Sequence, residues 1–419
     1  MGKIKSTTRR ALTTLICLSF SIITLSARTI EVGEGKAFSS ISAALHKAKA
    51  KDEILIYGKK IYKERLVIQK PITLKGVGTP IIDGGQRGDV IKVNADNVTI
   101  EGLQIQNSAR SSQVDYCGVH VKDAQFVTVR NCVFRKNQFS VMFQNCKNGL
   151  IANNNISSNI TYNPIMGNAV HCWKSDNMHI TGNNIGHNRD GIYLEFVNNS
   201  HIDHNTVSGC ARYGLHFMFS HFNVYNSNRF NHNQAGVAVM FAHNVEMINN
   251  TFEFNRGTSS YGLLIKELQY STIKWNRFLD NTVGLLIDGG SDLNVHHNVI
   301  KNNGWGMRLI SASTNDTIRH NNFLGNTFDM TTNVSYNRNN VNGNYWDKYE
   351  GYDLNKDGSG DVPFHPLSLF SMLAEQNENV LFFFHSFLMN LLDATEKVLP
   401  SITPDNYVDN YPHMNPYKL

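Results

Sequence analysis

The chain has 419 residues, of which 41% are hydrophobic and 17% are charged. This length is sufficient for a large buried core, and the composition excludes a disordered chain and a transmembrane protein. The formal net charge is +5, but four basic residues lie within the first 27, and the rest of the chain has 35 basic and 34 acidic residues. The remaining charge of +1 gives no electrostatic argument for a nucleic-acid partner.

Residues 1–27 have the pattern of a secretory signal peptide. A basic start precedes an apolar run over residues 11–25, and Leu25-Ser26-Ala27 supplies small residues for cleavage. A retained anchor helix is the alternative, but the run is short for a bilayer and is interrupted by Ser and Thr. We therefore expect a secreted protein.

Residues 38–50 space their apolar side chains as a helix does, and the apolar segments that follow read as short strands. From residue 132 onward a six-residue pattern recurs: Asn, any residue, Ile, Val or Phe, two further residues, and a second Asn. Its first positions are Cys132 and then Asn154, Asn183, Asn205, Asn228, Asn250, Asn276, Asn298 and Asn321, at steps of 22 to 29 residues. A second pattern, a small residue followed by an apolar, a variable and an apolar residue, runs in phase with it.

Two short strands and several turns in about 22 residues describe one coil of a parallel β-helix. We predict an all-β, right-handed parallel β-helix of about a dozen coils over residues 28–346, with an N-terminal helical cap. Asn tolerates left-handed backbone angles and its amide can bond to an identical residue one coil away, so the Asn residues should stack at equivalent corners. The two longest steps predict loops around residues 160–168 and 256–260.

Five cysteines remain beyond the predicted signal peptide. Their number is odd and no CxxC pair occurs, so they predict neither a disulfide framework nor a zinc site. They are Cys117, Cys132, Cys146, Cys172 and Cys210.

The strand period predicts which side chains point away from the core, because successive residues of a strand face opposite sides. The first outward column reads His120, Met142, His171, Tyr193, His216, Ala238, Leu264, Leu286 and Arg308. The second outward column, two residues further along each strand, reads Lys122, Gln144, Trp173, Glu195, Met218, Met240, Lys266, Asp288 and Ile310. Another stack, near the strand ends, is expected to hold His221 and His243.

The central coils thus place His, Met and aromatic residues where Lys, Thr or Glu is usual, and three interpretations follow. The favoured one is a protein-docking surface, because exposed apolar patches are seldom without a role. Its residues are His120, Met142, His171, Trp173, Tyr193 and Glu195. The second is a path for a soft metal, because thioether and imidazole groups suit Cu(I). Its ligands are His216, Met218, His221, Met240 and His243. In the third, loops cover this face and the residues form a satellite core.

A polysaccharide hydrolase or lyase is the rival function for such a fold. A glycosidase needs two carboxyl groups about 5–9.5 Å apart. Glu195 and Asp288 are four coils apart in the second outward column, which is about 19 Å at the spacing of adjacent strands. Asp190 and Glu195 share one coil, but a single pair beside one strand is weak evidence. The sequence therefore predicts no catalytic residue.

The chain beyond the repeats has two parts. Residues 347–366 form an Asp- and Gly-rich turn, in which DLNKDGSGD (353–361) resembles half of a calcium loop but has Phe364 where the final Glu is expected. A tight Asx turn is the favoured interpretation and calcium binding the alternative. Residues 367–419 form a helical tail and an extended C-terminus, in which His413-Met414 is a weak candidate ligand pair.

The tail contains an apolar run at residues 380–392 that is too short to span a bilayer. We expect it to bind a partner through Phe383, Phe384, Phe387 and Leu388. The alternative is that the helix folds back and caps the last coil.

GNYWDKYEGYDLNKDGSGDVPF (343–364) resembles the C-terminal motif of the NosD family, periplasmic maturation proteins for nitrous oxide reductase. Further stretches are similar to the same family, and the resemblance covers most of the chain after residue 27. They are KERLVIQKPITLKGVGTPIIDGG (63–85), GDVIKVNADNVTIEGLQI (88–105), DGIYLEF (190–196), RYGLHFMFSHFNVYNSN (212–228) and AGVAVMFAHNVEMINN (235–250).

The resemblance implies a non-enzymatic, periplasmic component of an ABC-type complex, membrane-associated through a permease and a cytoplasmic ATPase. The complex assembles the copper centres of nitrous oxide reductase together with a copper-carrying lipoprotein. The resemblance implies no tightly bound cofactor and at most a transient Cu(I). The absence of a phosphate-binding loop is consistent with ATPase chemistry in a partner. A carbohydrate-binding or carbohydrate-cleaving β-helix is the alternative.

Overall fold

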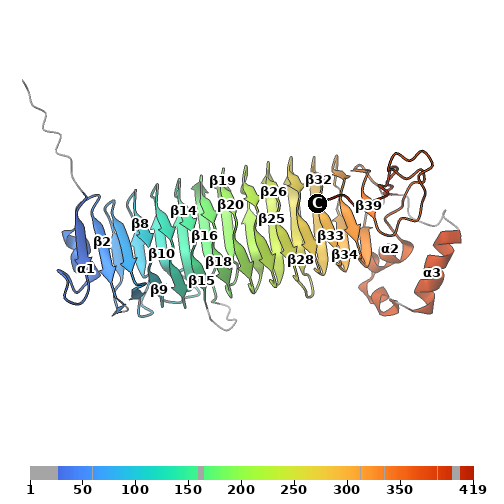
Figure 1. Cartoon of the computed structure of the whole chain (residues 1–419). Helices are drawn as coiled ribbons and strands as arrows, with labels where there is room; N and C mark the ends of the chain where they lie inside the picture. Colours follow the sequence, from blue (N-terminus) through green and yellow to red (C-terminus); the bar gives the residue numbers. More distant parts are fainter. Residues whose placement is uncertain are drawn as a thin grey trace, which may run out of the picture.

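The computed structural model describes residues 27–58, 60–158, 165–311, 313–334, 336–384, 386–398 and 406–419. The chain winds into a straight rod, a parallel β-helix of about 13 coils, which confirms the predicted fold (Figure 1). Nearly all of the predicted signal peptide lies outside the described residues. Among the helices that are described, none has the length and apolar character needed to cross a membrane.

Each coil contributes one strand to each of three parallel sheets, which we call sheets A, B and C. Sheet A contains 14 strands. They are β1 (Thr29–Val32), β2 (Glu53–Tyr57), β5 (Thr73–Val77), β8 (Thr99–Glu101), β11 (Thr128–Arg130), β14 (Leu150–Ala152), β17 (His179–Thr181), β20 (His201–Asp203), β23 (Val224–Asn226), β26 (Glu246–Ile248), β29 (Thr272–Lys274), β32 (Asn294–His296), β35 (Thr317–Arg319) and β38 (Asn340–Val341).

Sheet B contains 13 strands and follows sheet A in each coil. They are β3 (Ile61–Tyr62), β6 (Ile81–Asp83), β9 (Gln104–Gln106), β12 (Val133–Arg135), β15 (Asn155–Ser157), β18 (Asn184–Gly186), β21 (Thr206–Ser208), β24 (Arg229–Asn231), β27 (Thr251–Glu253), β30 (Arg277–Leu279), β33 (Val299–Lys301), β36 (Asn322–Leu324) and β39 (Tyr345–Trp346).

Sheet C contains 12 strands and carries both outward columns. They are β4 (Leu66–Ile68), β7 (Ile91–Val93), β10 (Cys117–Lys122), β13 (Phe139–Gln144), β16 (Val170–Asp176), β19 (Ile192–Asn198), β22 (Tyr213–Met218), β25 (Ala235–His243), β28 (Tyr261–Gln269), β31 (Val283–Ser291), β34 (Trp305–Ile310) and β37 (Phe328–Thr332).

The interior is a continuous apolar core in which like residues stack from coil to coil. Phe252, for example, stacks on Phe230 and Phe278 at ring-centroid distances of 5.7 and 4.8 Å. All five cysteines after the predicted signal peptide are buried and free. The core thus depends on apolar burial rather than on covalent links between coils.

The predicted Asn ladder occupies the corner between sheets A and B. Asn250 is typical, because its side-chain amide donates to the Tyr225 carbonyl and to Asn276 Oδ1, each at 3.0 Å. Its own Oδ1 accepts from the backbone and side-chain amides of Asn228, also at 3.0 Å. The ladder runs through Asn154, Asn183, Asn205, Asn228, Asn250, Asn276, Asn298 and Asn321, as predicted, and continues to Asn344. Every buried amide in it has a partner one coil away.

A second Asn ladder, at the corner between sheets B and C, runs from Asn233 through Asn255, Asn281 and Asn303 to Asn326. The predicted loop at residues 256–260 is present between β27 and β28. Of the other predicted loop, residues 160–164 lie outside the described part of the chain. The structure adds a loop between β9 and β10 that the repeat did not predict.

The N-terminal cap is the helix α1 (Ile41–Lys47), shorter than the predicted span. Ser40 caps it by accepting from the Ala43 amide, and Glu64 accepts from the amides of Ile41 and Ser42 at the same end. Carboxylate and hydroxyl oxygens are favoured at a helix N-terminus, because its first amides have no partner within the helix. Ile41 and Ala44 are fully buried in the main core, so α1 covers the first coils.

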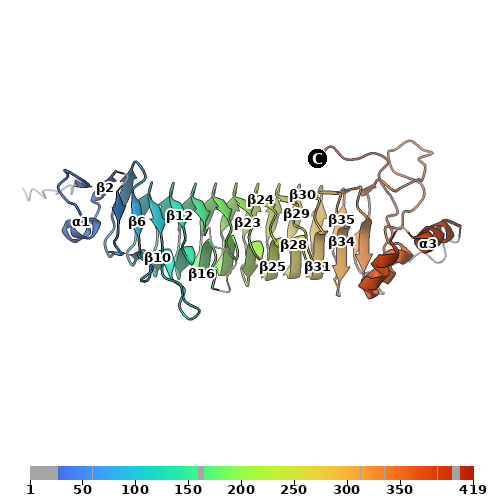
Figure 2. The same ribbon diagram turned by 90° about the horizontal axis from the view of Figure 1, so that it is seen from below.

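The C-terminal cap combines segments that are far apart in the sequence. Asp409 takes the place of the next Asn in the first ladder, accepting from the backbone amides of Gly343 and Asn344 and from Trp346 Nε1 at 2.8–2.9 Å. The final residues run back along sheet B, where the Tyr417 carbonyl accepts from Asn322 Nδ2 at 2.8 Å (Figures 1 and 2). The solenoid is therefore closed by the end of the chain itself.

The predicted helical tail is broken into α2 (Leu369–Gln376), the 3-10 helix η1 (Glu378–Phe383) and α3 (Phe387–Val398). Helix α2 packs on sheet C, where Arg308 makes a bidentate ion pair with Glu375 and Phe328 stacks on Phe370. The tail thus caps the last coil through α2, while α3 lies at the far end of the rod (Figure 2).

Candidate functional site

The two outward columns lie on sheet C in the predicted register. His171 pairs with Met142 on one side and with Tyr193 on the other, and Tyr193 pairs with His216. The second column is equally continuous from Lys122 to Ile310. The strand alternation inferred from the sequence is therefore confirmed.

The first outward column is much less exposed than the sequence suggested. Met142 and His216 each retain 6% exposure, Leu286 retains 4%, and Ala238 is fully buried. The expectation of a solvent-facing column is therefore wrong at these positions, where the satellite-core interpretation applies. The reason is that large side chains at neighbouring positions of adjacent coils cover one another.

Aromatic and imidazole rings form a continuous row along this column. His171 lies 5.7 Å from Phe139 and 4.8 Å from Tyr193, and Tyr193 lies 5.0 Å from His216, as ring-centroid distances. Both ring nitrogens of His171 and both of His216 are buried without a hydrogen-bond partner. Buried polar atoms without partners are rare in folded proteins, and they mark sites of possible ligand contact.

Burial lowers the pKa of His171 to about 4. Its imidazole is therefore neutral near pH 7, and neutral imidazole is the form that binds metals. The residue is only half-buried as a whole, so its exposed surface belongs to atoms other than the two nitrogens.

A buried ion pair lies next to His216. Asp190 is fully buried and accepts from Arg212 Nε at 2.8 Å, with a second contact to the same guanidinium. Burial alone would raise the pKa of Asp190, but the hydrogen bonds and charge of Arg212 outweigh it and hold that pKa below its usual range. His216 Nδ1 is 3.8 Å from Asp190 Oδ2, beyond hydrogen-bond distance.

The other four predicted metal ligands form two pairs, one on sheet C and one at the turn toward sheet A. Met218 and Met240 are paired in register and half-buried, and His221 stacks on His243 with ring centroids 3.9 Å apart. Burial, and the proximity of His243, lower the pKa of His221. The five predicted ligands thus divide into His216 beside Asp190, a Met pair and a His pair, and we call the two pairs together the corner group.

Three exposed phenylalanines beside this corner group were missed in the sequence. Phe196, Phe219 and Phe241 stack in a row with successive ring centroids 5.3 Å apart and exposures of 42, 37 and 37%. We call them the Phe ladder. Each has a left-handed backbone with φ near 50°, which is unfavourable for a bulky residue. Their spacing of 23 and 22 residues, in phase with the repeat, was the available signal.

The remaining predicted interface residues have separate environments. Trp173 is half-buried under the ammonium of Lys174, which lies 4.5 Å from its ring centroid, and Glu195 is half-buried beside the Phe ladder. In the tail, Phe383 and Phe387 are 53% and 81% exposed. Phe384 instead packs against Phe328 in the C-terminal cap. The side chain of Leu388 lies outside the described part of the structure.

The two carboxylates considered for a glycosidase, Glu195 and Asp288, do not form a close pair in the structure. Glu195 and Asp288 lie four coils apart in the second outward column, with Met218, Met240 and Lys266 between them.

The Asp-rich turn is an Asx turn, in which Asp353 accepts from the amides at 356–358 at 2.6–3.2 Å.

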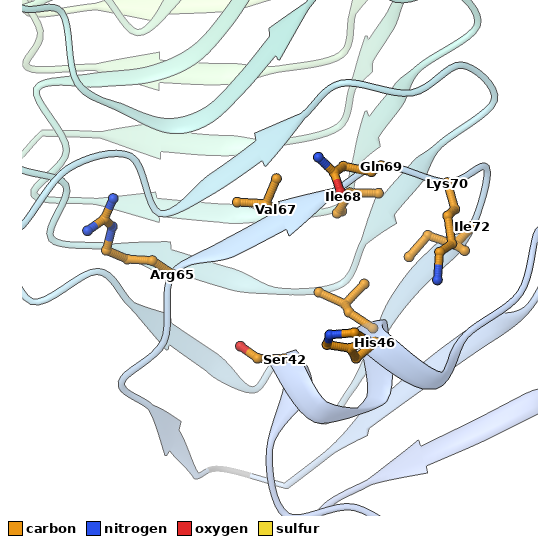
Figure 3. A pocket seen from close by; sticks show the side chains of 9 residues that line it. Ser42, His46, Arg65, Val67, Ile68, Gln69, Lys70 and Ile72 are labelled. Carbon is orange, nitrogen blue, oxygen red and sulfur yellow. The ribbon is translucent and has the colours of Figure 1, made fainter.

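A pocket of about 380 Å³ lies between α1 and β4, at the N-terminal end of the rod (Figure 3). Its nine lining residues include His46, Arg65 and Lys70 but no carboxylate. The guanidinium of Arg65 is already engaged by the Asp89 carbonyl, and the Lys70 ammonium by the Ala48 carbonyl. The pocket therefore offers no acid–base pair for catalysis.

A family model described as periplasmic copper-binding protein (NosD) matches residues 51–167 and 159–351. A Pseudomonas aeruginosa protein named "Probable ABC transporter binding protein NosD" is 26% identical over 372 residues, which cover 84% of this chain and 86% of that protein.

Among solved structures, the A-module of the Azotobacter vinelandii mannuronan C-5 epimerase AlgE4 is 14% identical, with a TM-score of 0.51 over 72% of this chain and 89% of its own. The Streptococcus pneumoniae surface adhesin PfbA is 12% identical, with a TM-score of 0.51 over 72% and 94%. At such identities these two structures indicate the fold alone.

Proposed function

Because this chain belongs to the NosD family of periplasmic copper-binding proteins, we propose that it is a non-enzymatic accessory protein of an ABC-type transporter complex. In this role it helps to assemble the copper centres of nitrous oxide reductase, by docking the reductase, by relaying Cu(I), or by both. The named relative supports an association with an ABC transporter. The further partners are the permease, the ATPase and a copper-carrying lipoprotein.

The observation that carries the docking role is the Phe ladder. The left-handed backbone recurs at this corner in other coils, where Asn145, Lys174 and Glu267 occupy it, so it belongs to the turn. What is particular to the Phe ladder is that three bulky, stacked rings are exposed there, and aromatic and Met side chains are enriched at protein interfaces. Met218 and Met240 extend the same patch toward the first outward column.

The corner group supports the relay role. Two thioethers and two stacked imidazoles are ligands that suit Cu(I) and that bind it without a thiol. Stacking at 3.9 Å also disfavours the protonation of both rings, because two like charges would face each other. The group lies directly beside the Phe ladder, so that a docked partner would meet it.

Docking is tested by copurification of the mature chain with its permease and ATPase, and separately with the reductase. We expect the triple variant Phe196→Ala, Phe219→Ala, Phe241→Ala to fold normally and to lose at least one of these partners. The matched control replaces Phe126, Tyr270 and Trp275, which are 54, 61 and 44% exposed elsewhere, with Ala. Equal retention of every partner by both variants would contradict docking through the Phe ladder.

A carbohydrate-binding protein is the second candidate, because sugar rings also stack on exposed aromatic rows. The same two variants distinguish it in a binding assay against acidic and neutral polysaccharides. Retention of a polysaccharide that depends on the Phe ladder, together with no effect on reductase copper content, would favour this candidate.

A further inference from the structure

A second group of metal-binding side chains lies at the N-terminal end of sheet C, outside the predicted ligand set. Ligand atoms of Asp89, Cys117 and His120 all lie within 4.8 Å of one another. Two bonds of about 2.0–2.3 Å to one metal ion hold their ligand atoms no more than about 4.6 Å apart. That limit applies only to two ligands on opposite sides of an ion. Three ligand atoms around one ion lie about 3.5–4 Å apart, so the group must contract by up to about 1 Å to close on an ion.

A fourth ligand comes from the next coil. Met142 Sδ lies 3.9 Å from Cys117 Sγ, and these two residues form a small apolar cluster with Phe139 that is separate from the main core. Asp89 lies just before β7, and the other three residues lie on β10 and β13, the next two strands of sheet C. The sequence did not suggest this site, because Asp89 and Cys117 are 28 residues apart and follow no metal-binding spacing.

The contacts of Asp89 give it a positioning role. Its Oδ1 accepts from the Cys117 amide at 2.7 Å, and its Oδ2 lies 3.3 Å from Lys92 Nζ and 3.4 Å from His120 Nδ1. His120 Nε2 lies 3.4 Å from Gln144 Oε1, so this contact must open before Nε2 can bind an ion. The carboxylate is thus already balanced by an ammonium group and oriented toward the imidazole. A carboxylate that holds a metal-binding His is a recurrent outer partner of metal sites.

The remaining ligands are a thiol, an imidazole and a thioether, and this set favours a soft ion. The site is also closed, because Cys117 is fully buried, Met142 is 6% exposed and the His120 side chain is 19% exposed. A monovalent ion bound to one thiolate adds no net charge, whereas a divalent ion would leave an uncompensated charge in a buried place.

We propose that Cys117, His120 and Met142 form a closed Cu(I) site and that Asp89 holds His120 in place for it. On binding, the Cys117 S–H bond breaks, the proton passes to solvent, and the sulfur bonds to Cu(I) with no change of oxidation state. His120, the most exposed of the three, is the entry side. The site rests on the proposed function only for the choice of copper, and it does not depend on docking.

The test is an anaerobic titration of the mature chain with Cu(I) in competition with a chromophoric Cu(I) chelator. We expect one tight Cu(I) per chain, whose affinity falls at least about tenfold in Cys117→Ala, His120→Ala, Met142→Leu and Asp89→Asn. Met142→Leu nearly conserves volume, so it remains informative if Cys117→Ala fails to fold. Copper-edge X-ray absorption should show two sulfur ligands, and one in Met142→Leu.

Two controls separate this site from other thiols and from the corner group. Cys172→Ala removes an equally buried free thiol of sheet C that faces the main core, and it should leave the affinity unchanged. A variant with Met218, His221, Met240 and His243 replaced should also keep one tight Cu(I). A parent chain that binds this Cu(I) but does not dock the reductase would contradict the proposed function and leave the site standing.

Three results would overturn the site. One is an unchanged Cu(I) affinity in folded Met142→Leu and His120→Ala. Another is a copper spectrum without sulfur ligands. The third is preferential binding of Zn(II) that is lost in Asp89→Asn but kept in Met142→Leu, since it would identify a hard-ion site in which Asp89 is a ligand.

Discussion

The Asn ladder and the part of the first outward column from His120 to His216 are both stacks of polar or polarisable side chains that repeat from coil to coil, yet their polar atoms differ in whether they have hydrogen-bond partners. Each amide of the Asn ladder has partners above and below it. In the first outward column, His171 and His216 bury both ring nitrogens without a hydrogen-bond partner, and His216 Nδ1 lies 3.8 Å from Asp190 Oδ2. The hydrogen-bonded Asn ladder stabilises the fold, whereas the unpaired imidazole nitrogens of the first outward column cost stability. Buried polar atoms of this kind occur where a ligand or partner contacts them.

The largest expected effect comes from breaking the Asn ladder. Asn250→Ala would leave the Tyr225 carbonyl and the Asn228 amide buried without their side-chain partner. Each unsatisfied group costs about 1–3 kcal/mol, so we expect a loss of roughly 2–5 kcal/mol in the free energy of unfolding. Urea denaturation measures it. The control Asn249→Gly lies next to it on the surface at φ 54°, which Gly accepts, and should change stability little.

The next effect compares the two parts of the tail. Asp409→Ala removes the acceptor that ends the Asn ladder and should cost about 2–4 kcal/mol, because buried amides of Gly343 and Asn344 lose their partner. Phe387→Ser, at 81% exposure, should cost almost nothing. Thermal unfolding of the two variants measures the difference. Equal melting temperatures would show that the C-terminal segment is not a cap.

A pH dependence should distinguish the two stacks, because the Asn ladder does not titrate. The unfolded pKa of His171 is near 6.5 and the folded one about 4, lowered by burial. Between these values the unfolded chain binds the additional proton, so the contribution of His171 is present above pH 6.5 and is lost as the pH falls to 4. In His171→Phe this loss should be smaller than in the parent but should not vanish, because burial also lowers the pKa of His296 to about 4. Denaturation midpoints at pH 7 and pH 4.5 measure the difference. An unchanged pH profile would place the titration elsewhere.

The smallest effect on stability should come from the Phe ladder. Phe219→Gly relieves a left-handed backbone at φ 49° and removes a ring that is 37% exposed. Relief of about 1 kcal/mol should offset the lost ring contacts, so the folded state should be as stable as the parent or slightly more so. Binding of the docked partner should nevertheless weaken. A clear loss of stability would mean that the ladder is structural.

The sequence by itself determined the coils, because a β-helix repeats one local solution. Each coil must turn at the same corners and present the same inward residues, so the Asn spacing and the strand alternation sufficed to place Asn154 to Asn321 and both outward columns in register. Local chemistry also identified the stacked pair His221 and His243. None of these features depends on which distant segments meet.

Only the tertiary structure decided burial and the contacts between distant residues. Whether His216 is exposed depends on how the rings of adjacent coils cover one another. The alternation of inward and outward residues along a strand does not predict this covering. The Cys117 group unites residues 28 positions apart, and Asp409 meets Asn344 and Trp346 from more than 60 positions away. Such contacts arise because the solenoid brings successive coils within about 5 Å of one another and because the end of the chain returns along the coils. A local sequence pattern specifies neither which residues of successive coils meet nor the path of the chain end.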